Sequence, residues 1–315
     1  MNQAYDLHAV DIDGDGDLDI VAGGVESNEI AWFENDGSAN PSWSKTSIAT
    51  TAQHARDVDV ADMDGDGDLD IVSASNADNT IAWYENNGAA DPTFAYASIA
   101  TTADEASDIQ VADVDGDGDL DIISASGNDD EITWFENDGA SDPTFATAII
   151  ATSADNPHEV FIADMDSDGD LDIISTSIGD STVAWYENNG ATDPSWTAAD
   201  IATNVSGAHG IYVEDMDNDG DKDIVIASFT DDTIRWFESD GGANPSWSAT
   251  TITTALDGAR NLEIFDLDKD GDLDILATGQ NDDKIAWFEN NGAANPSWGS
   301  AQVITTSFDQ PHNVA

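Results

Sequence analysis

The sequence predicts an all-β protein, a β-propeller built from four-stranded antiparallel blades. A nine-residue run with five aspartates, first seen as DIDGDGDLD at 11–19, returns every 51 residues and occurs six times. Each repeat also holds four short apolar or alternating stretches separated by turn residues, and no window keeps a helical period of 3.6. Four strands in a repeat of 40–50 residues are typical of a propeller blade. We expect six blades; the alternative is a seven-bladed array of which this chain is a truncated part.

The second repeat illustrates the expected strands in order. An alternating stretch at 57–60 is followed by the aspartate run, and an apolar β-branched stretch at 70–74 comes next. After a polar turn, an aromatic stretch at 81–86 leads into a loop rich in Gly, Asn, Asp and Pro, and a last stretch covers 94–99. Residues with high strand propensity between turn-forming residues predict four strands per repeat.

The repeat also predicts where each blade begins and ends within a single domain, 1–315. The expected blades are 1–51, 52–102, 103–153, 154–204, 205–255 and 256–308. The tail, DQPHNV at 309–314, repeats the opening DNPHEV of the fourth module at 155–160. We therefore expect residues 309–315 to overlap the start of a further first strand.

The composition restricts the class of partner. The chain has 7 basic and 66 acidic residues, a formal net charge of −59, and this field would repel nucleic acid and anionic membrane surfaces. Hydrophobic residues make up 40% of the chain, which is enough for a sizeable core. There is no cysteine and no apolar stretch of the roughly 20 residues that cross a membrane. Because the first residues do not resemble a signal peptide, we expect a secreted or cell-surface protein whose signal lies outside this sequence.

The aspartate runs predict calcium sites, about one per repeat. Ca²⁺ takes six to eight oxygen ligands from carboxylates and carbonyls. In the first loop the spacing assigns side-chain ligands to positions 1, 3, 5 and 9, a backbone carbonyl ligand to position 7 and a sharp turn to Gly16. An EF-hand is excluded because position 12 is Ala22 and the flanks read as strands. Magnesium fits an all-protein carboxylate cage less well, and the remaining alternative is a solvated acidic turn without metal.

The predicted metal residues are the five aspartates of each loop. They are Asp11, Asp13, Asp15, Asp17 and Asp19; Asp62, Asp64, Asp66, Asp68 and Asp70; Asp113, Asp115, Asp117, Asp119 and Asp121; Asp164, Asp166, Asp168, Asp170 and Asp172; Asp215, Asp217, Asp219, Asp221 and Asp223; Asp266, Asp268, Asp270, Asp272 and Asp274.

The aspartate loop, followed by the sequence IAWFEN or a close variant, resembles the FG-GAP/VCBS repeats of bacterial secreted proteins. The loops are similar to those of integrin α-subunit propellers, and the resemblance covers all six repeats. It implies a calcium-stabilised propeller, usually seven-bladed, that serves in adhesion or carbohydrate binding or stands beside a catalytic domain. The count of six repeats departs from that pattern.

One variable position, six residues before each aspartate loop, is the candidate ligand site. In a propeller this position would lie around the mouth of the central channel, on the face opposite the calcium loops. Two of the three arginines and three of the five histidines of the chain stand at this position, counting its equivalent in the tail. Arginine could bind a carboxylate or a sugar hydroxyl. The alternative is that these side chains pair with neighbouring acids such as Asp57 and Glu159 and line a wet channel. The position reads Tyr5, Arg56, Ser107, His158, His209 and Arg260, with His312 in the tail.

Two sets of aromatic residues recur at fixed repeat positions. Both sets favour packing between blades, with stacking on sugars as the alternative. The first set is Trp32, Trp83, Trp134, Trp185, Trp236 and Trp287, and the second is Trp43, Phe94, Phe145, Trp196, Trp247 and Trp298.

These observations favour a binding module over an enzyme. We expect a non-catalytic propeller that recognises a glycan or an extracellular protein, without nucleic-acid binding or membrane insertion. One alternative is a lyase of uronate polysaccharides, in which Arg56 or Arg260 neutralises a carboxylate and His158, His209 or Tyr5 acts as base. The other is a structural or designed repeat scaffold. The sequence does not indicate an oligomeric state.

Overall fold

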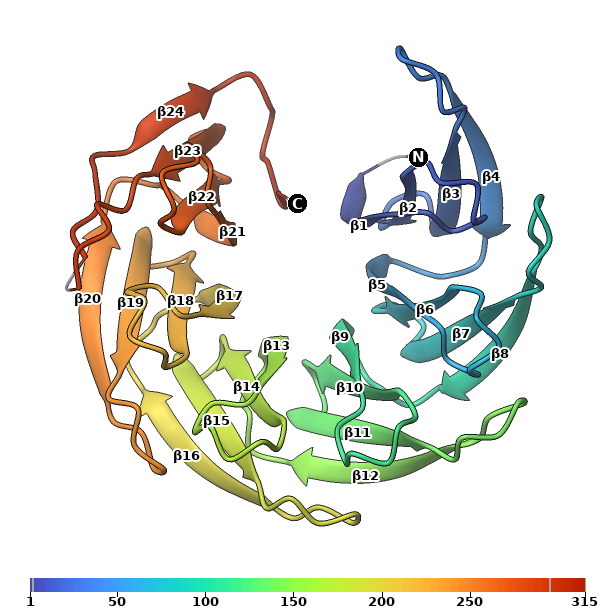
Figure 1. Cartoon of the computed structure of the whole chain (residues 1–315), viewed down its shortest axis with the longest axis horizontal. Helices are drawn as coiled ribbons and strands as arrows, with labels where there is room; N and C mark the ends of the chain where they lie inside the picture. The colour runs from blue at the N-terminus through green and yellow to red at the C-terminus, as the bar shows by residue number, and fades with distance from the viewer. Residues whose placement is uncertain (2, 295, 315) are drawn as a thin grey trace. The chain divides into compact units, whose positions relative to one another are not determined.

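The computed structural model describes residues 1, 3–294 and 296–314, and in them the chain is all-β. Twenty-four strands form six four-stranded antiparallel sheets, and in every sheet the strands lie in sequence order (Figure 1). Each sheet is one blade, so the predicted fold class and the count of six blades are confirmed. The described residues hold no helix that is long and apolar enough to pass through a bilayer.

The chain divides into two compact units, 1–157 and 158–315, and three blades belong to each. The blades of the first unit are β1 (Ala4–Val10), β2 (Asp19–Gly24), β3 (Glu29–Asn35) and β4 (Trp43–Ala49); β5 (Ala55–Ala61), β6 (Asp70–Ser75), β7 (Thr80–Asn86) and β8 (Phe94–Ala100); β9 (Ala106–Ala112), β10 (Asp121–Ser126), β11 (Glu131–Asn137) and β12 (Phe145–Ala151).

The blades of the second unit follow the same order, with Pro157 as the first residue of their first strand. They are β13 (Pro157–Ala163), β14 (Asp172–Ser177), β15 (Thr182–Asn188) and β16 (Trp196–Ala202); β17 (Ala208–Glu214), β18 (Asp223–Ser228), β19 (Thr233–Ser239) and β20 (Trp247–Thr253); β21 (Ala259–Phe265), β22 (Asp274–Gly279), β23 (Lys284–Phe288) and β24 (Gln302–Thr305).

The hydrophobic core lies between consecutive blades rather than within one sheet. In the first unit, Val21 and Trp32 of one blade pack in a buried cluster with Ile71 and Tyr84 of the next. Equivalent clusters join the other neighbouring blades inside each unit. Four tryptophans of the first aromatic set, Trp32, Trp83, Trp185 and Trp236, belong to these clusters, and Trp32 is only 1% exposed. Most of the second set packs at their margins, whereas Trp43 is 46% exposed.

The fourth strand of each blade is the exception to this burial. It forms an edge of its sheet, pairing only with the third strand. Its residues are mostly exposed, including the large side chains of Tyr96 (61%) and Ile149 (53%).

Two rows of hydrogen bonds join consecutive blades inside a unit. In one row, the turn between the second and third strands accepts an amide from the next blade, as when Asn28 Oδ1 accepts His54 N at 3.0 Å. In the other, an acidic residue of a first strand accepts an amide of the next first strand. Asp57 Oδ2 accepts Ile109 N at 2.8 Å, and Glu159 Oε2 accepts Ile211 N at 3.1 Å. The first strands of consecutive blades are thus joined through side chains.

The tail makes the same two contacts without forming a strand in its described residues. Gln310 N donates to Asp283 Oδ1 at 3.0 Å, and Val314 N donates to Asn261 Oδ1 at 3.2 Å. Here a neutral asparagine takes the place that an acid holds in the first four blades, and Gly210 stands there in the fifth. A charge is therefore not required at this position.

Burial of the acidic acceptors affects their protonation. Burial raises the pKa of Asp57 well above its ordinary value, and the nearby Asp108 and Asp6 carboxylates raise it further. The pKa of Asp6 is also raised by burial. A carboxyl group whose pKa is raised on folding stabilises the protein in its protonated form, and this stabilisation is lost as the pH rises through the folded-state pKa.

We therefore predict that Asp57→Asn stabilises the protein at neutral pH. The asparagine keeps an acceptor for Ile109 N and removes a buried charge beside two others, so the free energy of unfolding at pH 7 should rise by about 1 kcal/mol. Urea denaturation in chelator measures this. The gain should shrink as the pH falls toward 5, while the control Asp91→Asn, at an exposed position, changes little. A less stable Asp57→Asn protein at pH 7 would contradict the argument.

Candidate functional site

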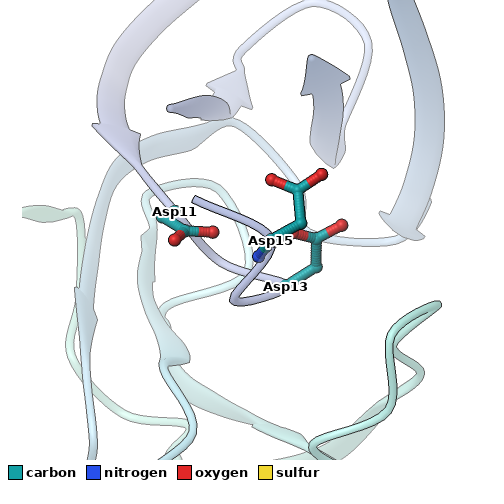
Figure 2. A group of neighbouring side chains, drawn as sticks. All are labelled: Asp11, Asp13 and Asp15. Atoms are coloured by element: carbon teal, nitrogen blue, oxygen red, sulfur yellow. Dashed lines mark hydrogen bonds between the residues drawn. The ribbon is translucent and has the colours of Figure 1, made fainter. Parts of the chain in front are cut away.

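The six aspartate loops lie between the first and second strands of the blades, and their carboxylates converge. In the first loop, oxygen atoms of Asp11, Asp13 and Asp15 lie within 4.8 Å of one another (Figure 2). The residues at the same positions converge in the loops at 62–70, 113–121 and 215–223. In the loop at 164–172 the group consists of Asp164, Asp166 and Asp172. The structure thus brings together the predicted ligands at positions 1, 3 and 5, or at 1, 3 and 9.

Hydrogen bonds within each loop hold these carboxylates in place. Gly16 N donates to Asp11 Oδ2 at 3.0 Å, Asp15 N to Asp13 Oδ1 at 3.2 Å, and Asp17 N to Asp15 Oδ1 at 2.9 Å. Such side-chain-to-backbone bonds are characteristic of aspartate in turns. They orient the oxygens of positions 1, 3 and 5 before any ligand binds.

The backbone explains why position 6 is always glycine whereas position 4 varies. At position 6 the φ angles are between +97° and +102°, a region that L residues rarely adopt. At position 4 they are between +60° and +76°, close to the left-handed helical region that Asn and a few other residues tolerate. Ser167, Asn218 and Lys269 stand there in three of the repeats.

The aspartates at position 7 lie against the turn after the third strand. A Cβ atom on Gly37, where φ is +64°, would overlap the carboxylate of Asp17, and the same pairing recurs in all six blades. This packing explains the glycine in these turns, which read Asn-Asp-Gly or Asn-Asn-Gly and, in the fifth blade, Ser-Asp-Gly. The backbone carbonyl role expected for position 7 stays a prediction.

The aspartates at position 9 have partners that the sequence did not indicate. Asp70 is buried; its Oδ1 accepts Asn86 N at 2.7 Å and its Oδ2 accepts Met63 N at 3.2 Å. In the first blade, Trp32 Nε1 donates to Asp19 Oδ2 at 2.9 Å. Burial raises the pKa of Asp70 to about 6 and that of Asp121 to about 7. Position 9 therefore fastens the loop to the third strand of its own blade.

The loops fit a hard cation on structural grounds. Asp11 Oδ1 and Asp113 Oδ1 are buried without a hydrogen-bond partner, which is costly for a carboxylate oxygen unless a cation or donor satisfies it. Partial burial and neighbouring carboxylates raise the pKa of Asp13 and of its equivalent Asp115. The donors are oxygen atoms only, a set that suits Ca²⁺.

Two of the three candidate ligand positions of the first unit, Tyr5 and Arg56, contact each other. The Arg56 guanidinium lies over the Tyr5 ring, 5.3 Å from its centroid. The Ser107 hydroxyl is within hydrogen-bonding distance of the Ala125 and Pro157 carbonyls, 3.2 and 3.0 Å away. The tyrosine and arginine, 51 residues apart in sequence, thus form one cationic and aromatic surface.

The second unit pairs its candidate positions differently. His209 Nδ1 and His158 Nε2 are 2.8 Å apart, and both imidazoles are buried. The His209 ring also meets the edge of Phe229, with centroids 5.3 Å apart. Because one of the two facing nitrogens must accept a hydrogen bond, at least one imidazole is neutral at that atom.

Arg260 also has a partner within the second unit. Its Nη1 donates to Gln280 Oε1 at 2.9 Å, and Gln280 Nε2 lies 3.3 Å from His312 Nε2. The alternative, pairing with a neighbouring acid, is seen at His158, whose Nδ1 is 3.8 Å from Glu159 Oε1. The placement of all these residues around a channel mouth stays a prediction.

A family model described as FG-GAP-like repeat matches residues 11–73, 62–124, 113–175, 166–226 and 215–277. Virginiamycin B lyase from Staphylococcus aureus is similar in structure, with a TM-score of 0.63 and 14% identity over 99% of this chain and 87% of that one. Periplasmic gluconolactonase from Pseudomonas aeruginosa has a TM-score of 0.66 and 12% identity, over 94% and 84%. The biofilm matrix protein Bap1 of V. cholerae has a TM-score of 0.51 and 18% identity, over 84% and 42%. No curated protein matches the chain by sequence.

These comparisons correct one prediction. The sequence favoured a protein that is not an enzyme, because it showed no set of nucleophile, base and orienting residue. Two of the structurally similar proteins are a lyase and a lactonase by name, so the same architecture carries catalytic sites. At this level of identity the likeness shows the fold alone, and fold does not decide function. Exclusion of catalysis is therefore not supported.

The loop geometry predicts different tolerances for two glycines of one loop. A Cβ atom would meet nothing within 4 Å at either Gly116 or Gly118, so only backbone strain distinguishes them. Their φ angles are +76° and +102°. We expect Gly118→Ala to lower the free energy of unfolding by about 2 kcal/mol and Gly116→Ala by about 1 kcal/mol or less. Thermal denaturation in chelator compares them, and equal losses would refute the strain argument.

Proposed function

The chain belongs to the FG-GAP-like repeat family, and from this premise we propose that it is a calcium-binding protein that recognises carbohydrate through the first strands of its blades. The observation that carries the calcium part is the convergence of three carboxylates in the aspartate loops, with buried oxygens at Asp11 and Asp113 that lack a protein donor. Positions 1, 3 and 5 of each loop would hold the ion, together with position 9 where it converges with them. The bound calcium offsets the repulsion among the loop carboxylates and stabilises the fold.

The calcium proposal predicts a stoichiometry and a stabilisation. Isothermal titration calorimetry of the chelator-treated protein should give about six Ca²⁺ per chain, one per aspartate loop. Asp113→Asn should remove about one of them, because it removes a charged ligand. Each site stabilises the folded state by about 2.7 kcal/mol when free calcium is 100 times its dissociation constant.

Two controls accompany this experiment. Asp142→Asn, at an exposed position outside the loops, should leave the stoichiometry unchanged. Magnesium in place of calcium should give weaker binding, because it demands a tighter octahedral site. No heat of binding, with an unchanged melting temperature in chelator, would exclude the calcium role.

The carbohydrate part rests on Tyr5 and Arg56. An aromatic ring and a guanidinium side by side offer a stacking surface and hydrogen-bond donors, which suit the hydroxyl groups of a sugar or the carboxylate of a uronate. A net charge of −59 disfavours anionic partners that lack such a cationic contact. An extracellular protein is the other partner class that this surface suits.

The proposed location is outside the cytoplasm, either extracellular or periplasmic. The names of two structurally similar proteins, a periplasmic gluconolactonase and a biofilm matrix protein, support this. Calcium is also abundant enough there to fill sites of modest affinity.

A second candidate is catalysis at the His158–His209 pair, in line with the enzymes among the structurally similar proteins. A neutral imidazole oriented by a second imidazole can offer its other ring nitrogen as a general base. The reaction class that suits it is elimination from a uronate polysaccharide. In that reaction the base removes a proton from the carbon beside the carboxylate, and the electron pair of that C–H bond forms a carbon–carbon double bond. The bond to the leaving sugar oxygen breaks, and this oxygen takes a proton from the solvent.

One panel of glycans tests both candidates. We expect calcium-dependent binding to at least one polysaccharide, weakened tenfold or more by Tyr5→Ala or Arg56→Ala. Arg235→Ala is the matched control, because that arginine pairs with Asp231 at 2.9 Å. Ultraviolet absorbance from unsaturated products, lost in His209→Gln, would establish the lyase. No binding and no absorbance change, with the protein folded in calcium, would favour a protein partner or a scaffold role.

A further inference from the structure

Each of three aspartate loops is contacted by an asparagine of the next blade. Asn86 Nδ2 donates to the Ile12 carbonyl at 3.1 Å and to the Leu69 carbonyl at 2.9 Å. Ile12 is position 2 of the preceding loop, between the predicted calcium ligands Asp11 and Asp13, whereas Leu69 belongs to the asparagine's own loop. One amide group therefore joins two loops that lie 51 residues apart.

The same arrangement recurs at two other junctions. Asn137 Nδ2 donates to the Met63 and Leu120 carbonyls at 2.9 and 3.0 Å. Asn290 Nδ2 donates to the Met216 and Leu273 carbonyls at 3.0 and 3.1 Å. All three asparagine side chains are 1–2% exposed, so water does not replace these bonds easily.

The remaining polar groups of the asparagine are also occupied. Asn137 N donates to Asp121 Oδ1 at 2.8 Å, and Asn137 Oδ1 accepts Gly139 N at 3.0 Å. Asp121 is position 9 of the asparagine's own loop. The side chain therefore has no freedom to turn, and a shift of one loop must move the other or break a buried hydrogen bond.

We propose that Asn86, Asn137 and Asn290 are positioning residues that couple calcium binding between consecutive blades. The inference rests on the proposed calcium binding. A cation bound by positions 1 and 3 fixes the peptide carbonyl between them, and the asparagine of the next blade then receives an ordered acceptor. The asparagine then orders the loop of its own blade. A second ion that binds to this loop therefore pays a smaller conformational-entropy cost. Coupling of this kind is reciprocal and gives positive cooperativity.

One blade of the chain lacks this asparagine, and another has an asparagine that bonds its own loop, which makes it a control for the link between loops. In the fifth blade Ser239 takes the place of the asparagine: its backbone amide still donates to Asp223 Oδ1, but it has no side-chain amide. The junction between the fourth and fifth blades therefore lacks this link. In the first blade Asn35 makes the bonds to its own loop, with Nδ2 3.0 Å from the Leu18 carbonyl and its backbone amide on Asp19. No bond from its side chain to another loop is found in the described residues.

Calorimetric titration of the full chain with Ca²⁺ tests the coupling. We compare the unaltered protein with Asn137→Ser, Ser239→Asn and the control Asn35→Ser. Asn137→Ser should weaken the calcium affinity of the second and third loops by about two- to tenfold, which corresponds to the net free energy of one hydrogen bond. It should also lower the Hill coefficient. Ser239→Asn should raise the Hill coefficient. Asn35→Ser should lower stability in chelator without changing the Hill coefficient.

The outcomes separate this proposal from the one on which it rests. Non-cooperative binding of calcium by the unaltered protein would leave the calcium proposal standing and overturn the coupling. Equal effects of Asn137→Ser and Asn35→Ser on the Hill coefficient would also overturn it, because the asparagine would then act only on its own loop. No calcium binding at all would remove both. Should Asn137→Ser fail to fold, an unchanged Hill coefficient in Ser239→Asn would be enough to reject the coupling.

Discussion

Crowding of like charge in the aspartate loops is the constraint on which the rest of the structure depends. Five carboxylates in nine residues repel one another, and the chain supplies only seven basic side chains to balance 66 acids. Hydrogen bonds and packing within each blade hold the carboxylates in place despite this repulsion. Positions 1, 3 and 5 accept amides of their own loop, position 7 packs on a glycine turn, and position 9 is buried against the third strand. What is left is a set of converging oxygens with the character of a cation site.

The junction between two blades is built from three kinds of contact at three levels of the sheet. The turn after the second strand accepts an amide at one end, and an acid or asparagine of the first strand accepts another in the middle. The asparagine at the end of the third strand reaches the aspartate loop of the preceding blade at the other end. Apolar side chains such as Trp32 and Ile71 fill the space between these contacts. Since the hydrogen bonds are directional, they fix the register of one sheet on the next, whereas the apolar contacts supply most of the stability.

The fold was predictable from the sequence because the features that define it recur every 51 residues. A strand, a turn or a buried tryptophan seen once in a repeat is seen six times, which removes the ambiguity of a single short segment. The sequence did not reveal the partners of the position-9 aspartates within a repeat, nor the contacts that join residues of different repeats. Asn137 lies 74 residues from Met63, and His158 meets His209 only because two first strands run side by side. Periodicity identifies equivalent positions but not which of them touch, and it carries no information on whether a site catalyses a reaction.

The exposed fourth strands have a consequence for the protein in solution. Each is a sheet edge with free backbone groups, and side chains such as Tyr96 and Ile149 make it a template for pairing with another chain. The mutual repulsion of whole molecules, each with a formal charge of −59, opposes such pairing. Acid or a high concentration of divalent cations neutralises that charge while leaving the edges exposed. An excess of the divalent ions proposed for the loops would therefore lower the barrier to fibrous self-assembly.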